Sequence, residues 1–325
     1  MNKIPAFLRY FAYGLLGLIT VGALLFWYFI YSPEPEAPQL SGTLTKATIE
    51  VGGLTRTYRS YVPKGLPKGA PLLFVMHGSG QNGAQIRIET GYEFERLADR
   101  HGFAVVYPNA RSFDWNDCSK VGDFSFKGRE VDDVGFLSAL AGRLSEELEL
   151  DRKRVFATGV SSGGLMSLRL ALEAPDKFRA VAAVSANLPA AENFKCKPSG
   201  QASSVMLMNG TKDPLVPYAG GESSLFGLFF KAGMLRSSRE SADYFAGQNK
   251  ISLTPAMTLS INGDAQVGRA LWRNDSKLEV ELVTIHGGGH GLPQAYWRRP
   301  RLLGPSPMAP NGAAIIWDFF AGQRP

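Results

Sequence analysis

Short apolar runs alternate with amphipathic segments through most of the chain. Continuous apolar runs at 71–76, 103–107, 155–158, 180–186, 205–208 and 280–285 have the length of strands covered on both faces. Segments with helical apolar spacing lie between or after them, at 90–101, 131–148, from Leu165 onward and at 313–320. Strands that alternate with helices predict an α/β fold with a doubly wound, mostly parallel sheet. The ligand site of such a sheet lies beyond the carboxyl ends of its strands.

Two further segments change this picture. Residues 43–51 and 55–62 have strand character and are joined at Gly52-Gly53, which predicts an N-terminal antiparallel hairpin. Residues 220–231 are rich in glycine and serine and then become aromatic. This pattern fits either a mobile loop over the site or a short helix, and the sequence leaves both open.

The N-terminal region has a different pattern. Residues 11–31 form an uninterrupted, mostly apolar run of 21 residues without charge, long enough to cross the hydrocarbon core of a bilayer. Lys3 and Arg9 precede it, so we expect residues 1–10 to be cytoplasmic and the rest of the chain to lie in the periplasm or outside the cell. We expect a transmembrane signal anchor at 11–31, a proline-rich linker at 32–42 and one domain at 43–325.

A cleaved signal peptide is the alternative for the same segment, and it would make the protein secreted. The apolar region of a signal peptide is usually about 7–15 residues long and ends in small residues. This run is longer, and Trp27, Tyr28 and Tyr31 stand at its end, where aromatic rings favour the membrane interface. The pattern therefore favours an uncleaved anchor.

Composition and charge exclude two classes of function. The chain of 325 residues has a net charge of +6 and one dense basic cluster, Arg298-Arg299-Pro300-Arg301, which we interpret as a solvated surface loop. Nucleic-acid binding is therefore not expected. The cysteines are Cys118 and Cys196, too few for a thiolate metal site. They follow different strands at the edge that should carry the site, so a disulfide would staple its rim, but sequence alone leaves the pairing open.

A serine stands at the strand-to-helix junction near residue 160. Gly159-Val160-Ser161-Ser162-Gly163 is a G-x-S-x-G pattern, typical of a sharp turn that exposes a nucleophilic serine. The turn brings strand and helix close together, so the residues two before and two after the serine must be small. Glycines fill both positions for Ser161, whereas Ser162 would have Val160 at the first. We therefore predict Ser161 as the nucleophile.

A serine hydroxyl needs a neighbouring base, and that base needs an orienting carboxylate. The chain has four histidines, of which His286 and His290 follow the last apolar strand run. We predict His290 as the base, because the glycines at 287–289 allow a longer loop to return over the serine. His286 follows the strand directly and is poorly placed for that role.

The predicted acid is Asp213, which follows the strand run 205–208 and precedes a proline. Asp132 and Asp133 are alternative carboxylates, but their place at the start of a helix gives them a structural role there. The backbone N–H groups of Ser79 and Ser162 are the candidate oxyanion donors. Ser79 stands between two glycines after the strand run 71–76, and Ser162 follows the nucleophile.

Several motifs together resemble the polyhydroxybutyrate depolymerase and feruloyl esterase group of α/β-hydrolases. They lie at 71–81, 131–136, 151–164, 209–218, 287–290 and 316–320, in the same order and with similar spacing. The resemblance implies an α/β-hydrolase fold and a Ser161, Asp213 and His290 triad. It also implies hydrolysis of a small-molecule ester or polyester through an acyl-enzyme, with no cofactor and no metal, and secretion in most members.

The chain also departs from this family. Gly291-Leu292-Pro293-Gln294 follows the histidine where the family usually has Thr-Trp-Pro-Gly, and Ser79 stands where the family often has cysteine. The missing tryptophan leaves the substrate unnamed, although Tyr296 and Trp297 could supply an aromatic wall. An acyltransferase or a peptidase on the same fold remains an alternative, as does a catalytically inactive, membrane-tethered binding protein.

Overall fold

The computed structural model describes residues 5–121, 131–225, 227, 229–260, 267–274 and 278–323. Its strands are β1 (Thr43–Val51), β2 (Leu54–Val62), β3 (Leu72–Met76), β4 (Ala104–Pro108), β5 (Val155–Val160), β6 (Ala180–Val184), β7 (Ser204–Gly210), β8 (Gly221–Leu225), β9 (Phe229–Leu235), β10 (Met257–Ser260), β11 (Val267–Arg273) and β12 (Glu279–Ile285). Its α-helices are α1 (Ala6–Phe29), α2 (Gly83–Glu89), α3 (Glu93–His101), α4 (Asp133–Glu147), α5 (Ser162–Glu173), α6 (Ser238–Gln248) and α7 (Gly312–Gly322), with 3₁₀ turns η1 (Arg111–Phe113), η2 (Ala191–Asn193) and η3 (Arg301–Leu303).

The central sheet has parallel strands in its middle and antiparallel strands at both edges. In the described part of the chain, ten strands have the order β1-β2-β4-β3-β5-β6-β7-β12-β11-β10. The pairs from β4 to β12 are parallel, whereas β1, β2, β10 and β11 pair antiparallel with their neighbours. The predicted doubly wound sheet and its N-terminal hairpin are thus confirmed.

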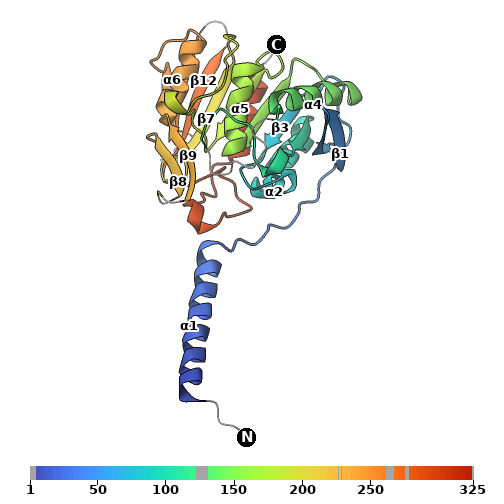
Figure 1. The fold of residues 1–325 in the computed structure, drawn as a ribbon. Coiled ribbons are helices and arrows are strands. Elements are labelled where there is room, and N and C mark those ends of the chain that lie inside the picture. Colours follow the sequence, from blue (N-terminus) through green and yellow to red (C-terminus); the bar gives the residue numbers. More distant parts are fainter. Residues whose placement is uncertain are drawn as a thin grey trace.

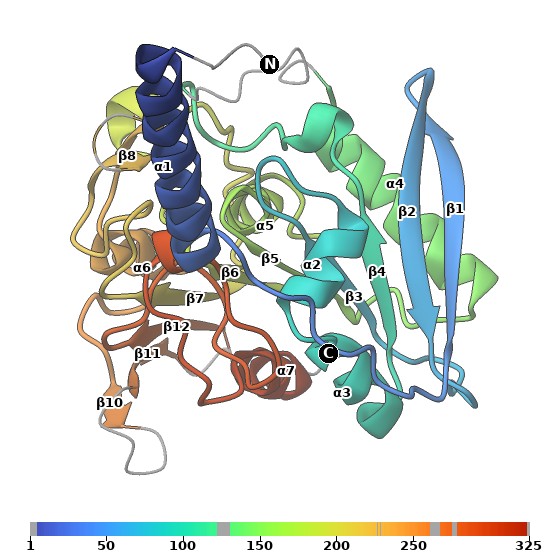
Figure 2. The ribbon, with the colours of Figure 1, turned by 90° about the horizontal axis from the view of Figure 1, so that it is seen from below.

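Helices cover both faces of this sheet, and alternate residues of each buried strand point to opposite faces. In β3, Leu72 and Phe74 pack in the core layer of α4, α5 and α6, and Leu73 packs in the layer of α2, α3 and α7. Figure 2 shows the sheet edge-on between these layers, with α4 and α5 on one side and α3 and α7 on the other. Burial on two sides is why these strands appear in the sequence as continuous apolar runs.

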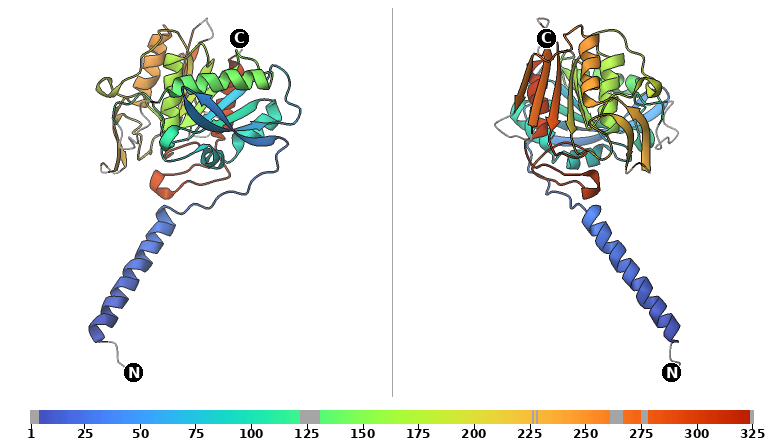
Figure 3. Two further views of the ribbon diagram at one scale, coloured as in Figure 1. Left: turned by 45° about the vertical axis from the view of Figure 1, so that its right-hand side comes forward. Right: turned by 90° about the vertical axis from the view of Figure 1, so that its left-hand side faces the viewer.

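The N-terminal helix stands apart from the domain. Helix α1 has no buried residue and projects away from the sheet in the views of Figures 1 and 3. Its carboxyl end contacts the turn η3, where the Arg301 guanidinium lies 4.1 Å from the centre of the Tyr28 ring. The linker then leads to β1 at the far edge of the sheet (Figure 1).

Several elements differ from the sequence prediction. The expected helix at 90–101 is α3, and a separate helix, α2, precedes it and was not predicted. In the segment 220–231, for which a loop or a helix was expected, the described residues 221–225 and 229–231 belong instead to the paired strands β8 and β9. Helix α6 and the edge strands β10 and β11 were not predicted. A signal that could have found α6 is the capping box of Ser237 and Glu240 at its start.

Candidate active site

Ser161 lies at the apex of the turn between β5 and α5. Its φ of 58° and ψ of −122° are strained for a residue with a side chain. A Cβ on Gly159 would come within 3.0 Å of the Gly163 backbone, and one on Gly163 would come as close to the Met76 carbonyl of β3. Only glycine fits at these two positions, which is the physical reason for the G-x-S-x-G pattern.

Asp213 and His290 meet at the same end of the sheet. They follow β7 and β12, which are parallel neighbours, so both loops leave the same edge. His290 Nδ1 donates to Asp213 Oδ2 over 2.9 Å, and both side chains are buried. The other carboxylate oxygen, Oδ1, accepts the N–H groups of Leu215 at 2.8 Å and Val216 at 2.9 Å. Three donors therefore hold the Asp213 carboxylate in place.

The electrostatics favour an ionised Asp213. Burial alone would raise the pKa of this carboxyl, but the charge of His290 and the hydrogen bonds from His290, Val216 and Leu215 outweigh it and hold the pKa below its ordinary value. An ionised carboxylate keeps the proton of the neutral imidazole on Nδ1. His290 Nε2 is then the nitrogen that can accept a proton.

Backbone contacts hold the loop that carries His290. The His290 N–H donates to the Leu303 carbonyl at 2.8 Å, and the Gly289 N–H donates to the Pro305 carbonyl at 2.7 Å. A Cβ on Gly289 would collide with Leu303 and Gly304, so glycine is needed for this approach. His286, the rejected alternative, is exposed beside Gly268 of β11.

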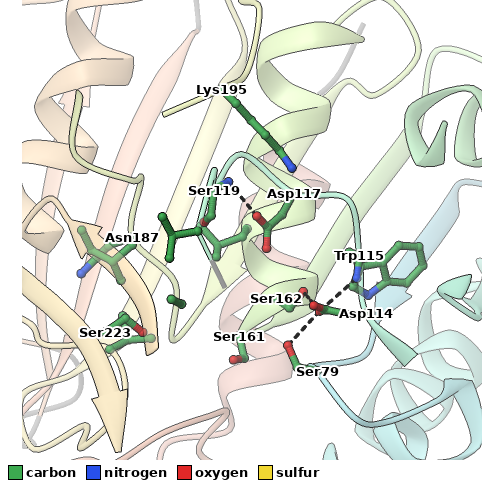
Figure 4. Close-up of a pocket in the computed structure, with 15 residues that line it drawn as sticks. Ser79, Asp114, Trp115, Asp117, Ser119, Ser161, Ser162, Asn187, Lys195 and Ser223 are labelled. Carbon is green, nitrogen blue, oxygen red and sulfur yellow. Dashed lines mark hydrogen bonds between the residues drawn. The ribbon is translucent and has the colours of Figure 1, made fainter. Parts of the chain in front are cut away.

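Ser161 and His290 line one cavity of about 250 Å³, together with apolar side chains that include Leu215, Val216 and Leu303. Among the described residues, no hydrogen bond joins the Ser161 hydroxyl to the imidazole. Such catalytic contacts are often long in free enzymes and shorten when substrate binds. A second cavity of about 70 Å³ adjoins Ser161 on the side of Asp117 and Lys195 (Figure 4).

The loop 77–80 lies directly against the nucleophile. A Cβ on Gly78 would be 3.4 Å from the Ser161 Cβ. The Ser79 N–H donates to no other group in the part of the chain that the structure describes. Ser162 is the first residue of α5, where a helix has no intrahelical acceptor for its N–H. The two candidate oxyanion donors therefore stand beside Ser161 with their N–H groups available.

His77 is a structural member of this loop. It is fully buried, and desolvation lowers its pKa from 6.5 to about 4 despite the raising effects of the Gly78 hydrogen bond and Glu89. Its Nε2 accepts the Ala110 N–H at 3.0 Å, so the proton is on Nδ1, which donates to the Gly78 carbonyl at 2.7 Å. A neutral imidazole thus fixes the backbone just before Ser79.

A partly buried polar chain that the sequence analysis missed joins this loop to the His290 loop. Gln81 accepts the Gly78 N–H at 3.0 Å and donates to Glu89 at 2.7 Å. Glu89 pairs with Arg299 at 2.9 Å, and Arg299 donates to the Leu292 carbonyl at 3.0 Å. The prediction of a wholly solvated basic cluster was therefore wrong for Arg299. Its partner Glu89 lies 210 residues away in the sequence, so no local pattern reveals this ion pair.

The remaining candidates have separate places. The structure joins Cys118 to Cys196 by a disulfide, with a Cα–Cα distance of 4.9 Å. Asp132 accepts the Gly135 N–H at the start of α4, and Asp133 forms a buried ion pair with Arg56 at 2.6 Å. Neither carboxylate lies among the residues that line the cavities at Ser161.

The aromatic wall considered for the missing tryptophan is not formed by Tyr296 and Trp297. Tyr296 is half exposed, with Arg96 stacked 4.2 Å from its ring centre. The Gln294 side chain accepts the N–H groups of both Tyr296 and Trp297, which fixes a local turn. Neither aromatic residue lines the cavities that contain Ser161. Among the described residues, no group of three His, Cys, Asp or Glu side chains is placed to hold a metal ion.

Comparison with known proteins places the chain in a family. The sequence model described as esterase PHB depolymerase matches residues 56–215. The NocK protein of Nocardia uniformis subsp. tsuyamanensis, whose name describes a candidate esterase, is 30% identical over 305 residues, which cover 90% of this chain and 87% of that protein. The probable feruloyl esterase C of Aspergillus terreus is 26% identical and covers 95% of this chain and 97% of its own length.

Two further comparisons agree. Poly(3-hydroxyalkanoate) depolymerase C of Paucimonas lemoignei is 26% identical over 72% of this chain and 58% of its own length. The solved structure of an acetyl xylan esterase from Aspergillus awamori superposes with a TM-score of 0.56 at 16% identity, over 77% of this chain and 94% of that one, which shows a common fold. The chain belongs to the esterase PHB depolymerase family of α/β-hydrolases.

Proposed function

We propose that this protein is a serine ester hydrolase that works through a Ser161, His290 and Asp213 triad and an acyl-enzyme. The observation that carries the proposal is the 2.9 Å contact between His290 Nδ1 and the buried Asp213 carboxylate, beside a cavity that Ser161 also lines. Such an imidazole can accept the serine proton during attack and return it to the leaving alcohol.

Each step uses groups at the edge of the sheet. His290 Nε2 takes the proton of Ser161 Oγ as that oxygen attacks the ester carbonyl carbon. The N–H groups of Ser79 and Ser162 stabilise the oxyanion that forms. The alcohol leaves with the proton from His290, and water then attacks the acyl-enzyme with the same base. Asp213 stays ionised and holds the imidazole in one tautomer, which its lowered pKa supports.

The two cavities fit an ester whose two substituents, on either side of the carbonyl group, differ in size. The larger cavity, of about 250 Å³, has an apolar wall of Leu215, Val216 and Leu303 that suits an acyl chain or aryl group. The smaller one, of about 70 Å³, has polar groups and suits a compact substituent. Relatives are named for polyhydroxyalkanoate and feruloyl ester hydrolysis, so both polyester ends and aryl esters belong in a substrate panel.

The test uses the full-length protein in detergent with p-nitrophenyl acyl esters, methyl ferulate, hydroxybutyrate oligomers and a peptide anilide. Ser161→Ala should lower ester turnover by roughly 10⁴–10⁶-fold while the unfolding midpoint stays unchanged. An active Ser161→Ala protein would refute the mechanism. Cleavage of the anilide alone would favour a peptidase.

For the N-terminal segment we propose an uncleaved membrane anchor, with the catalytic domain on the outer side of the membrane. Helix α1 is the one described helix long and apolar enough to cross a bilayer. Trp27 and Tyr28 lie at its carboxyl end, where exposed Arg298 and Arg301 surround them, a combination suited to the headgroup region. Retention in the membrane pellet after alkaline carbonate supports the anchor, and release of a shortened chain supports cleavage.

A further inference from the structure

One carboxylate joins the two segments that supply the candidate oxyanion donors. Asp114 Oδ1 accepts the Ser79 hydroxyl at 2.9 Å and the Ser162 hydroxyl at 2.8 Å. The same oxygen accepts the backbone N–H of its neighbour Trp115 at 3.1 Å, which fixes its direction. Figure 4 shows Asp114 between Ser79 and Ser162, with Ser161 beside them.

These two serines come from different parts of the fold. Ser79 follows β3 in a loop with glycine on both sides, and Gly80 has a φ of 75°. Such a loop has many accessible backbone conformations and needs outside contacts to hold one of them. Ser162 begins α5 and is rigid by comparison. An oxyanion hole is effective only when both N–H groups point to one position before the reaction begins.

The segment around Asp114 provides those outside contacts. The Phe113 carbonyl accepts the Gly80 N–H at 2.8 Å, so residues 113 and 114 hold the loop at the Ser79 side chain and at the peptide that follows it. Trp115 adds a third contact, because its indole N–H donates to the His77 carbonyl at 2.8 Å. The loop is thus joined to α5 through Asp114 and to the segment after β4 through Phe113 and Trp115.

We propose that Asp114 is a positioning residue that sets the relative placement of the Ser79 and Ser162 N–H groups. It acts through the two serine hydroxyls. Its charge alone would oppose a nearby oxyanion, so its contribution is geometric. This inference rests on the proposed esterase function and adds a residue to it.

The decisive variants are Asp114→Ala and Asp114→Asn in the full-length protein. The amide oxygen of asparagine can still accept from both serines, so Asp114→Asn should keep activity within about tenfold of wild type. Asp114→Ala should lower kcat by roughly 10²-fold with KM within about twofold, because loss of one oxyanion donor costs about 10²–10³ in turnover. A peptidyl or alkyl trifluoromethyl ketone, which forms a tetrahedral adduct, should lose affinity by the same factor as kcat/KM.

Two controls separate positioning from a general loss of structure. Asp132→Ala also removes a carboxylate bonded to a backbone N–H, at the start of α4, and should cost about 1 kcal/mol of stability without changing the ratio of ketone affinity to KM. The Ser79→Ala, Ser162→Ala double variant leaves Asp114 in place. It should reproduce the loss, and adding Asp114→Ala to it should cause no further loss.

The outcomes are distinct. An Asp114→Ala protein that binds the ketone as tightly as wild type overturns the inference while Ser161-dependent hydrolysis remains. A further loss in the triple variant beyond that of the double variant overturns it as well, and so does a double variant with wild-type ketone affinity, a measurement that leaves Asp114 in place. Hydrolysis that survives Ser161→Ala would instead refute the proposed function.

Discussion

Removal of the Cys118–Cys196 disulfide should lower stability by an amount that the structure sets. The bond closes a loop with a sequence separation of 78 residues. The loop-entropy relation gives about 15 cal/mol/K for such a loop, or about 4.5 kcal/mol at 25 °C. Because Cys118 and Cys196 are both buried, replacing them by alanine adds a smaller packing loss.

The assay is urea unfolding of the full-length protein in detergent, followed by tryptophan fluorescence. The Cys118→Ala, Cys196→Ala double variant should unfold with a free energy lower by about 4–5 kcal/mol. Dithiothreitol should destabilise the wild type by a similar amount and leave the double variant unchanged, which is the matched control. A difference below about 1 kcal/mol, or an effect of dithiothreitol on the double variant, would refute the reasoning. Such a bond also requires an oxidising compartment, as expected outside the cytoplasm.

Three other changes test single parts of the account. Asp213→Asn should lower kcat by roughly 10⁴-fold with unchanged stability, because the amide no longer selects the His290 tautomer. Steady-state kinetics at pH 7 would measure this loss, and near-normal turnover would contradict the prediction. Gly163→Ala should destabilise by about 1–3 kcal/mol in thermal unfolding, since its Cβ would meet the Met76 carbonyl, whereas Gly142→Ala in α4 has open space and should be neutral or stabilising. The pKa of His77 is lowered to about 4, so the native state binds fewer protons than the unfolded state between pH 4 and 6.5. This contribution to the free energy of unfolding is complete above pH 6.5, and about 3 kcal/mol of it is lost as the pH falls toward 4. A plot of the urea unfolding midpoint against pH should therefore fall less steeply for His77→Gln than for wild type over that window.

The central fold was predictable because its signal is local. Buried parallel strands such as β3 and β5 require continuous apolar runs, and those runs were visible in the sequence. The G-x-S-x-G pattern was equally informative, because the close approach of Gly163 to β3 forbids any side chain there. The edge hairpin β10–β11 lacks such a signal, since edge strands alternate and are only partly covered.

The candidate site was predictable only in part, for a similar reason. Ser161, Asp213 and His290 each follow a strand that the pattern identifies, and parallel topology brings their loops to one edge. Asp114 and Arg299 have no such marker. Asp114 stands in a polar loop, and its bonds to Ser79 and Ser162 depend on the packing of α5 against β3. The sequence separation of these contacts hides them from any reading of local pattern.

The most direct test of the account is the site of covalent labelling by a fluorophosphonate, mapped by mass spectrometry of proteolytic peptides from the full-length protein. We predict one adduct, on Ser161, with labelling strongly reduced in His290→Ala because the hydroxyl then lacks its base. An adduct on Ser162 or elsewhere, or unchanged labelling of Ser161 without His290, would contradict the central claim that these residues form one catalytic unit.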